Sequence, residues 1–141
     1  MADRAWRGWP IVPVPKPRQT RKDKWQVRPA VARYRRFADE CRLLDVAFPP
    51  IGAWVIFVLP MPHSWTRKQK AANIGQFHRQ TPDLSNLVKA LEDALYKDDS
   101  AIADMRASKI WGNNGAILVG EITEPFEVPE YATTALSDLP S

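Results

Sequence analysis

A chain of 141 residues can form one domain with a modest hydrophobic core, but it is too short for a two-domain enzyme. Its 45% hydrophobic and 26% charged residues are typical of a globular protein, and a single cysteine, Cys41, excludes a disulfide scaffold and favours a reducing compartment. The longest apolar run, residues 52–61, is about half a membrane span, and no signal peptide is evident, so we expect a cytoplasmic protein without a membrane segment.

The net charge of +4 conceals an uneven distribution along the chain. Residues 1–82 contain sixteen Lys and Arg against five Asp and Glu, whereas residues 83–141 contain four against eleven. Cationic side chains attract phosphates, and clustered carboxylates need a cation to approach a polyanion. The pattern favours a polyanion as substrate, although solvated charges that merely cluster would look the same.

The N-terminal part of the chain is predicted to be extended and basic. Residues 9–18 alternate proline with β-branched residues, which predicts an extended segment or an edge strand. Residues 19–25 place basic side chains beside a tryptophan, which suits the backbone and bases of a nucleic acid. A solvated loop whose tryptophan covers the core is an equal alternative. The DNA-binding candidates in these two segments are Lys16, Arg18, Arg21, Lys22, Lys24 and Trp25.

A helix and a central strand are predicted next. Residues 32–44 place Tyr34, Phe37, Cys41 and Leu44 along one face at helical spacing. Because Cys41 lies on this apolar face, we interpret it as a core residue and not as a nucleophile. Residues 52–60 are apolar on both faces, which predicts a strand at the centre of a sheet.

Residues 61–80 are predicted to form an exposed loop with a short helix near residues 67–72. His63 and His78 are fifteen residues apart and have no partner at ligand spacing, so a zinc site is not expected. Phosphate contact is the preferred role for the basic side chains of this loop, although solvent-facing charge would have the same pattern. These side chains are Arg67, Lys68, Lys70 and Arg79.

The densest group of polar residues surrounds one predicted helix. Ser85 is expected to begin this helix, and Leu87, Leu91, Ala94 and Leu95 form its apolar face. Asn86, Lys89 and Asp93 lie on the opposite face, while Asp83 precedes the helix and Asp98 and Asp99 follow it. Acidic side chains at both ends of a helix, with a lysine between them, could hold a divalent metal against a phosphate.

The C-terminal part is predicted to contain two strands, residues 102–111 and 116–123. The Asn-Asn-Gly sequence between them predicts a hairpin turn. Residues 125–141 have little apolar content, so the domain is expected to span residues 1–124 and to be followed by a loosely held tail.

The segment PDLSNLVKALEDAL, followed by KDDSAI, resembles the signature of RusA-type Holliday junction resolvases, D-x-D-N-L-x-K-x-x-x-D-A-L…D-D-x-x-I/V. The upstream KPRQTRKDKWQVRPAVARYRRF and MPHSW segments are similar to the phage branch of that family, and the resemblance covers residues 13–124. It implies an α+β fold, with a small mixed β-sheet packed against two main helices, in a homodimer. It also implies an endodeoxyribonuclease that uses Mg²⁺ or Mn²⁺ to place paired nicks in a four-way DNA junction.

The resemblance also implies roles for individual residues. Asp83, Lys89 and Asp99 match catalytic positions, and Asp83 and Asp99, with Asp98 and Ser85, are the expected metal ligands. Asn86 and Asp93 are supporting residues. Three possibilities stay open for Lys89, which could face the phosphate, pair with Asp93, or do both. Asn86 could bond a ligand carboxylate or cap the helix.

Two departures from the family pattern concern the metal site. Ser85 stands where the family usually has its second catalytic Asp, and the segment before Asp98 is shorter than in better-known members. A hydroxyl is a weaker ligand for a hard cation than a carboxylate, so we expect weaker metal binding and a preference for Mn²⁺. Ser85 would also be a favourable N-cap, facing the same way as Asp83 if the chain before the helix is extended.

The alternative function is a branched-DNA-binding protein of the same fold without cleavage. An assembly factor, a third class, predicts no salt-dependent DNA affinity.

Overall fold

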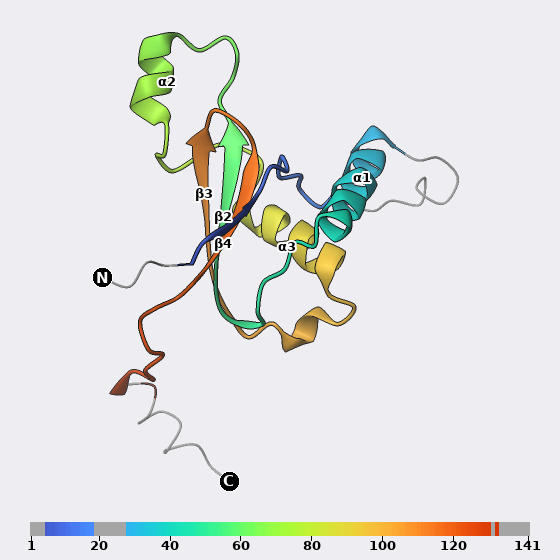
Figure 1. Cartoon of the computed structure of the whole chain (residues 1–141), viewed down its shortest axis with the longest axis vertical. Coiled ribbons are helices and arrows are strands. Elements are labelled where there is room, and N and C mark those ends of the chain that lie inside the picture. The colour runs from blue at the N-terminus through green and yellow to red at the C-terminus, as the bar shows by residue number, and fades with distance from the viewer. Residues whose placement is uncertain (1–4, 19–27, 131, 133–141) are drawn as a thin grey trace.

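The computed structural model describes residues 5–18, 28–130 and 132, and it shows a four-stranded sheet with two helices on one face (Figure 1). The strands are β1 (Arg7–Trp9), β2 (Ile51–Pro60), β3 (Asp104–Gly112) and β4 (Ala116–Glu121). The helices are α1 (Pro29–Leu43), α2 (Arg67–Asn73) and α3 (Leu84–Leu95), with a short 3-10 helix, η2 (Asp99–Ala101). The predicted α+β class, with a mixed sheet and two main helices, is confirmed.

Strand β2 is central, as its apolar faces predicted. The strand order is β1-β4-β2-β3, with β2 parallel to β3 and antiparallel to β4. Val55, for example, lies opposite Ala107 of β3 and Val119 of β4. Within the described ranges β3 and β1 are therefore the outer strands of this sheet, and β1 reaches it through β4 alone.

The predicted hairpin between the last two strands is wrong. Both strands form, but β2 lies between them. A strand that is apolar on both faces is stabilised most at the centre of a sheet, where neighbouring strands pair with both of its edges. This preference outweighs the local turn signal. The three residues between Gly112 and Ala116 cross two strand spacings, about 10 Å, which an extended chain of this length can span. The crossing is tight, since a Cβ on Gly115 would lie 2.7 Å from the Cα of Val12.

The core lies between the sheet and helices α1 and α3. Phe57 of β2, Leu87 and Leu91 of α3 and Cys41 of α1 are all buried there. Burial raises the pKa of the Cys41 thiol to about 12, with the charge of Glu40 adding to the effect. A neutral, inaccessible thiol confirms that Cys41 is a core residue.

Helix α3 begins earlier than predicted. Asp83 is the N-cap residue, and its carbonyl accepts the N–H groups of Asn86 at 3.1 Å and Leu87 at 3.2 Å. Ser85 is consequently inside the first turn and is not the cap. Asp and Ser are similarly favourable N-caps, so the sequence alone did not distinguish between them. The predicted extended path through residues 83–85, with Asp83 and Ser85 facing the same way, is therefore wrong.

The predicted edge strand near the N-terminus is shorter and starts earlier. Only Arg7–Trp9 pairs with β4, and residues 10–18 continue without a strand partner. In this segment Ile11 is buried in the core, and the N–H of Lys16 donates to the carbonyl of Asn86 at 3.0 Å. The segment thus runs beside the first turn of α3.

Two other predicted segments fall partly or wholly outside the described residues. The loop of residues 19–25 lies outside them, including Arg21, Lys22, Lys24 and Trp25. In the tail, residues 125–130 are exposed, and most of the remainder is not described. Among the described helices, none has the length and apolar character needed to cross a bilayer.

Candidate active site

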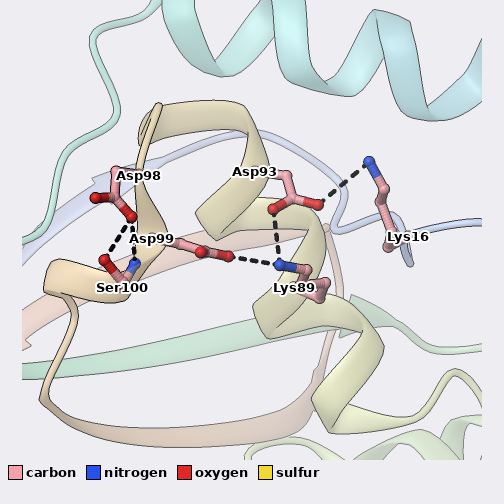
Figure 2. Close-up of polar contacts among 6 residues, drawn as sticks. All are labelled: Lys16, Lys89, Asp93, Asp98, Asp99 and Ser100. Carbon is pink, nitrogen blue, oxygen red and sulfur yellow. Dashed lines mark hydrogen bonds and ion pairs between the residues drawn. The ribbon is translucent and has the colours of Figure 1, made fainter.

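Four charged side chains from three parts of the chain form a continuous series beside α3. The Nζ atom of Lys89 lies 3.1 Å from Oδ1 of Asp93 and 2.5 Å from Oδ2 of Asp99, while Oδ2 of Asp93 lies 3.2 Å from Nζ of Lys16 (Figure 2). Lys89 and Asp93 are one helical turn apart, Asp99 comes from η2, and Lys16 comes from the N-terminal segment. We call Lys16, Asp93, Lys89 and Asp99 the charge chain.

The charge chain has an inner and an outer end. The side chains of Lys16 and Asp93 are 24% and 25% exposed, whereas those of Lys89 and Asp99 are 52% and 35% exposed. Hydrogen bonds to Asp99 and then to Asp93 raise the pKa of the Lys89 ammonium above its usual value. Lys89 is therefore positively charged at neutral pH, and it lies at the more exposed end of the charge chain, which a substrate can reach.

The two adjacent aspartates after α3 have different environments. The carboxylate of Asp98 accepts the N–H of Ser100 at 3.0 Å and its hydroxyl at 2.5 Å, which caps η2. These hydrogen bonds lower the pKa of Asp98. Figure 2 shows Asp98 directed toward Ser100, whereas Asp99 extends toward Lys89. Asp98 thus has a local structural role, and Asp99 is the residue of the pair that joins the charge chain.

Asp83, Ser85 and Asn86 lie at the N-terminal end of α3, whereas Asp99 follows the helix in the chain. All three are exposed. Among the described residues, the carboxylate of Asp83 makes no capping bond to the helix. The carbonyl of Asn86 accepts the Lys16 N–H, so the backbone of this residue holds the segment that bears Lys16.

The donor atoms suit a divalent cation in kind, but they do not form a complete ligand set. Carboxylate oxygens are the ligands that Mg²⁺ and Mn²⁺ prefer. In the part of the chain that the structure describes, no three His, Cys, Asp or Glu side chains are grouped so that they could hold a metal. The ammonium of Lys89 is also in contact with Asp99, so a cation bound there would share this carboxylate with Lys89.

One further carboxylate near this site was missed from the sequence. Glu92 is half-buried, and burial, followed by the negative charge of Asp99, raises its pKa. Its spacing of three residues from Lys89 was visible in the sequence. The burial was not, because Glu92 is adjacent to the predicted polar face rather than on it.

The loop that leads into Asp83 is fixed by a lysine that the sequence did not indicate. The ammonium of Lys109, on β3, donates to the carbonyl of Pro82 at 2.6 Å and also to that of Gln80. A charged donor makes stronger hydrogen bonds than a neutral one. Lys109 therefore holds the backbone immediately before Asp83. This contact joins residues 27 positions apart, and no local pattern could have predicted it.

His78 packs beside this loop as a neutral core residue. It is 5% exposed, its ring centroid lies 3.8 Å from that of Trp111, and its Nδ1 accepts the N–H of Gln80 at 3.3 Å. Burial, and then the positive charge of Lys109, lowers its pKa below 6.5. A protonated ring could not accept the Gln80 N–H.

Acid is therefore expected to destabilise the protein through His78. Its pKa is lower in the folded state than in the unfolded state, so its contribution to stability is present above pH 6.5 and is lost as the pH falls. The melting temperature of the wild type should fall more between pH 7.5 and pH 5 than that of His78→Phe. His63→Gln, at an exposed histidine, should follow the wild type. Equal losses in wild type and His78→Phe would contradict this expectation.

The candidate DNA-binding side chains occupy different environments. Helix α2 stands beyond the end of the sheet and has no buried residue, so it presents Arg67 and Lys68 to solvent, with Lys70 half-buried (Figure 1). Arg18 and Arg79 are also exposed. Lys16 differs from them because its ammonium is held in the charge chain.

Comparison with known proteins gives two findings. The family model described as Endodeoxyribonuclease RusA matches residues 9–120, which include β2, β3, all but the last residue of β4, the three helices and the charge chain. The uncharacterized protein YqaN of Bacillus subtilis (strain 168) is 35% identical over 78 residues, and the match covers 50% of this chain. It covers 55% of YqaN, so the chain spans about half the length of this relative.

Proposed function

Because the chain belongs to the RusA endodeoxyribonuclease family, we propose that it is a structure-specific endodeoxyribonuclease that resolves four-way DNA junctions by paired nicks. The observation that supports this most directly is the outer end of the charge chain. There a lysine whose pKa is raised lies 2.5 Å from an aspartate and is accessible to a phosphate. A fixed positive charge beside a carboxylate is the combination needed to bind a phosphodiester next to a metal ligand.

In this proposal each residue has one task. Asp83 and Asp99, with Ser85 as a weaker donor, would hold Mg²⁺ or Mn²⁺, whose chemistry when bound would be to activate a water and to neutralise charge on the phosphate. Lys89 directs its ammonium at the phosphate or leaving oxygen, and Asp93 restrains the lysine from one turn away. Arg67, Lys68, Lys70 and Arg79 hold the DNA backbone at a distance from the cut.

Paired nicks require two equivalent sites, so the proposal includes a homodimer. A junction with approximate two-fold symmetry fits a symmetric dimer, which would cut two strands at related positions. We place this activity in the cytoplasm of a bacterial cell, with a phage or prophage origin. Sedimentation at micromolar concentration should show the dimer, and a monomer there would contradict this part of the proposal.

Cleavage of a labelled four-way junction with Mg²⁺ or Mn²⁺ tests the proposed function. We expect nicks at symmetric positions on two opposing strands. The second candidate, a DNA-binding protein without cleavage, is favoured by one observation: no three-acid metal group is present among the described residues. Salt-dependent junction binding without nicks in either metal would establish that candidate instead.

Changing Ser85→Asp is expected to keep or raise the cleavage rate and to lower the metal concentration needed for half-maximal cleavage several-fold. Ser85 is exposed in the first turn of α3, where a carboxylate adds an anionic ligand and stabilises the helix by about 0.3–1 kcal/mol. Metal titrations of wild type, Ser85→Asp and the neutral control Ser85→Asn measure the effect. Loss of cleavage in Ser85→Asp would show that the hydroxyl itself is required.

A further inference from the structure

Lys16 is held by contacts with two helices, unlike the exposed Lys68 on α2. Its N–H donates to the carbonyl of Asn86 at 3.0 Å, and its Nζ lies 3.2 Å from Oδ2 of Asp93. The same Nζ lies 4.1 Å from the centroid of the Tyr34 ring on α1, which is a favourable cation–π distance. The backbone N–H and the ammonium thus both have partners, and the side chain is only 24% exposed.

Asp93 divides its two oxygens between two lysines. Oδ2 faces Lys16 and Oδ1 faces Lys89, which in turn lies against Asp99. The four charges alternate in sign and sum to zero. Without Lys16, Lys89 would be the only cation of the charge chain, and its ammonium would lie between the carboxylates of Asp93 and Asp99. Asp93, half-buried and poorly screened, would then attract Lys89 more strongly and leave a net negative charge beside the phosphate.

We propose that Lys16 is a positioning residue of the active site, which neutralises Asp93 so that Lys89 remains directed toward Asp99 and the scissile phosphate. This inference rests on the proposed function and adds a residue to it. Direct contact of Lys16 with DNA is the competing role. It is disfavoured because the ammonium already has an anionic partner and an aromatic ring, both of which it would have to leave.

A double-mutant cycle separates the two roles. The variants are Lys16→Met, Asp93→Asn, their combination, and Lys16→Arg, with Arg35→Met on the exposed face of α1 as the matched loss of one positive charge. The measurements are the single-turnover cleavage rate at saturating protein and the salt dependence of junction affinity. Lys16→Met should lower the rate about 10-fold with affinity within about 2-fold. Lys16→Arg should restore most of the rate, and Arg35→Met should not change it.

The decisive comparison is Lys16→Met in the Asp93→Asn background. There it should cause no further loss of rate, because its effect passes through Asp93. An equal loss in both backgrounds would overturn the proposal. So would a weaker affinity with an unchanged rate and a salt slope reduced by about 0.9, which is the signature of one lost phosphate contact.

A readout that does not need cleavage keeps this inference separate from the proposed function. Changes in melting temperature across wild type, Lys16→Met, Asp93→Asn and the double variant should be non-additive, with the double variant no less stable than Asp93→Asn alone. Additive changes would refute the contact between Lys16 and Asp93 whatever the activity. A wild type that cuts no junction, together with non-additive melting temperatures, would instead refute the nuclease function and support the contact.

Discussion

Asp99→Asn is expected to abolish junction cleavage while leaving junction binding intact. The substitution keeps the shape of the side chain but removes its charge, so Lys89 loses the carboxylate at 2.5 Å and the proposed cation loses a ligand. Loss of one such electrostatic group typically lowers a rate by about 10²–10³-fold. Single-turnover cleavage in Mg²⁺ and Mn²⁺, with metal-free binding measured in parallel, tests this. Asp83→Asn should be equally inactive, because it removes the other proposed ligand.

The neighbouring aspartate provides a matched control. Asp98→Asn removes the same charge one residue earlier, but its carboxylate is bonded to Ser100 and not to Lys89. We expect this variant to lose some stability at η2 and to retain most of its cleavage rate. A loss as large as that of Asp99→Asn would make Asp98 a metal ligand as well. Full cleavage by Asp99→Asn would overturn the assignment of the site.

Lys89→Met is expected to lower the single-turnover rate by about 10²-fold with a much smaller effect on affinity. The variant keeps the aliphatic stem and removes the ammonium that joins Asp93 to Asp99. Because the pKa of Lys89 is raised, the folded protein keeps this charge as the pH rises, and the rate should not fall between pH 7 and pH 9 through its deprotonation.

Lys89→Arg distinguishes charge from position. An arginine keeps the charge but is longer and planar, so it should recover part of the rate and not all of it. If Lys89→Met cleaves within about 3-fold of wild type, the lysine is only a helical ion pair, whose typical contribution is about 0.3–0.5 kcal/mol.

Local patterns were sufficient for most secondary structure. The apolar faces of α1 and α3 follow from helical periodicity, except that Leu44 lies just after the end of α1 and is exposed. The continuous apolar run predicted the central strand β2, and the short helix α2 was also expected. Helix α3 begins one residue before the predicted start because Asp83 and Ser85 are both good caps. The predicted hairpin was wrong because β2 pairs on both edges and therefore lies between β3 and β4. Which strands are neighbours depends on the whole sheet and not on the turn sequence alone.

The composition of the site was predictable, but its connections were not. The sequence placed Lys89, Asp93 and Asp99 near one helix, because two of them are one turn apart and the third follows its end. The contacts of Lys16 with Asp93 and of Lys109 with Pro82 join segments separated by many residues. Only the packing of the N-terminal segment and β3 against α3 and its preceding loop creates them.

The position of β4 determines the order in which this protein can be assembled on the ribosome. β1 pairs with β4, and among the described strands β4 comes last in the chain. The N-terminal segment that bears Lys16 therefore remains without its strand anchor until residue 116 and those after it have emerged. Such long-range pairing makes folding slow relative to helical domains. A nascent or truncated chain that ends before β4 has every aspartate of the proposed site. It lacks the strand with which β1 pairs, so the N-terminal segment that bears Lys16 is not anchored to the sheet.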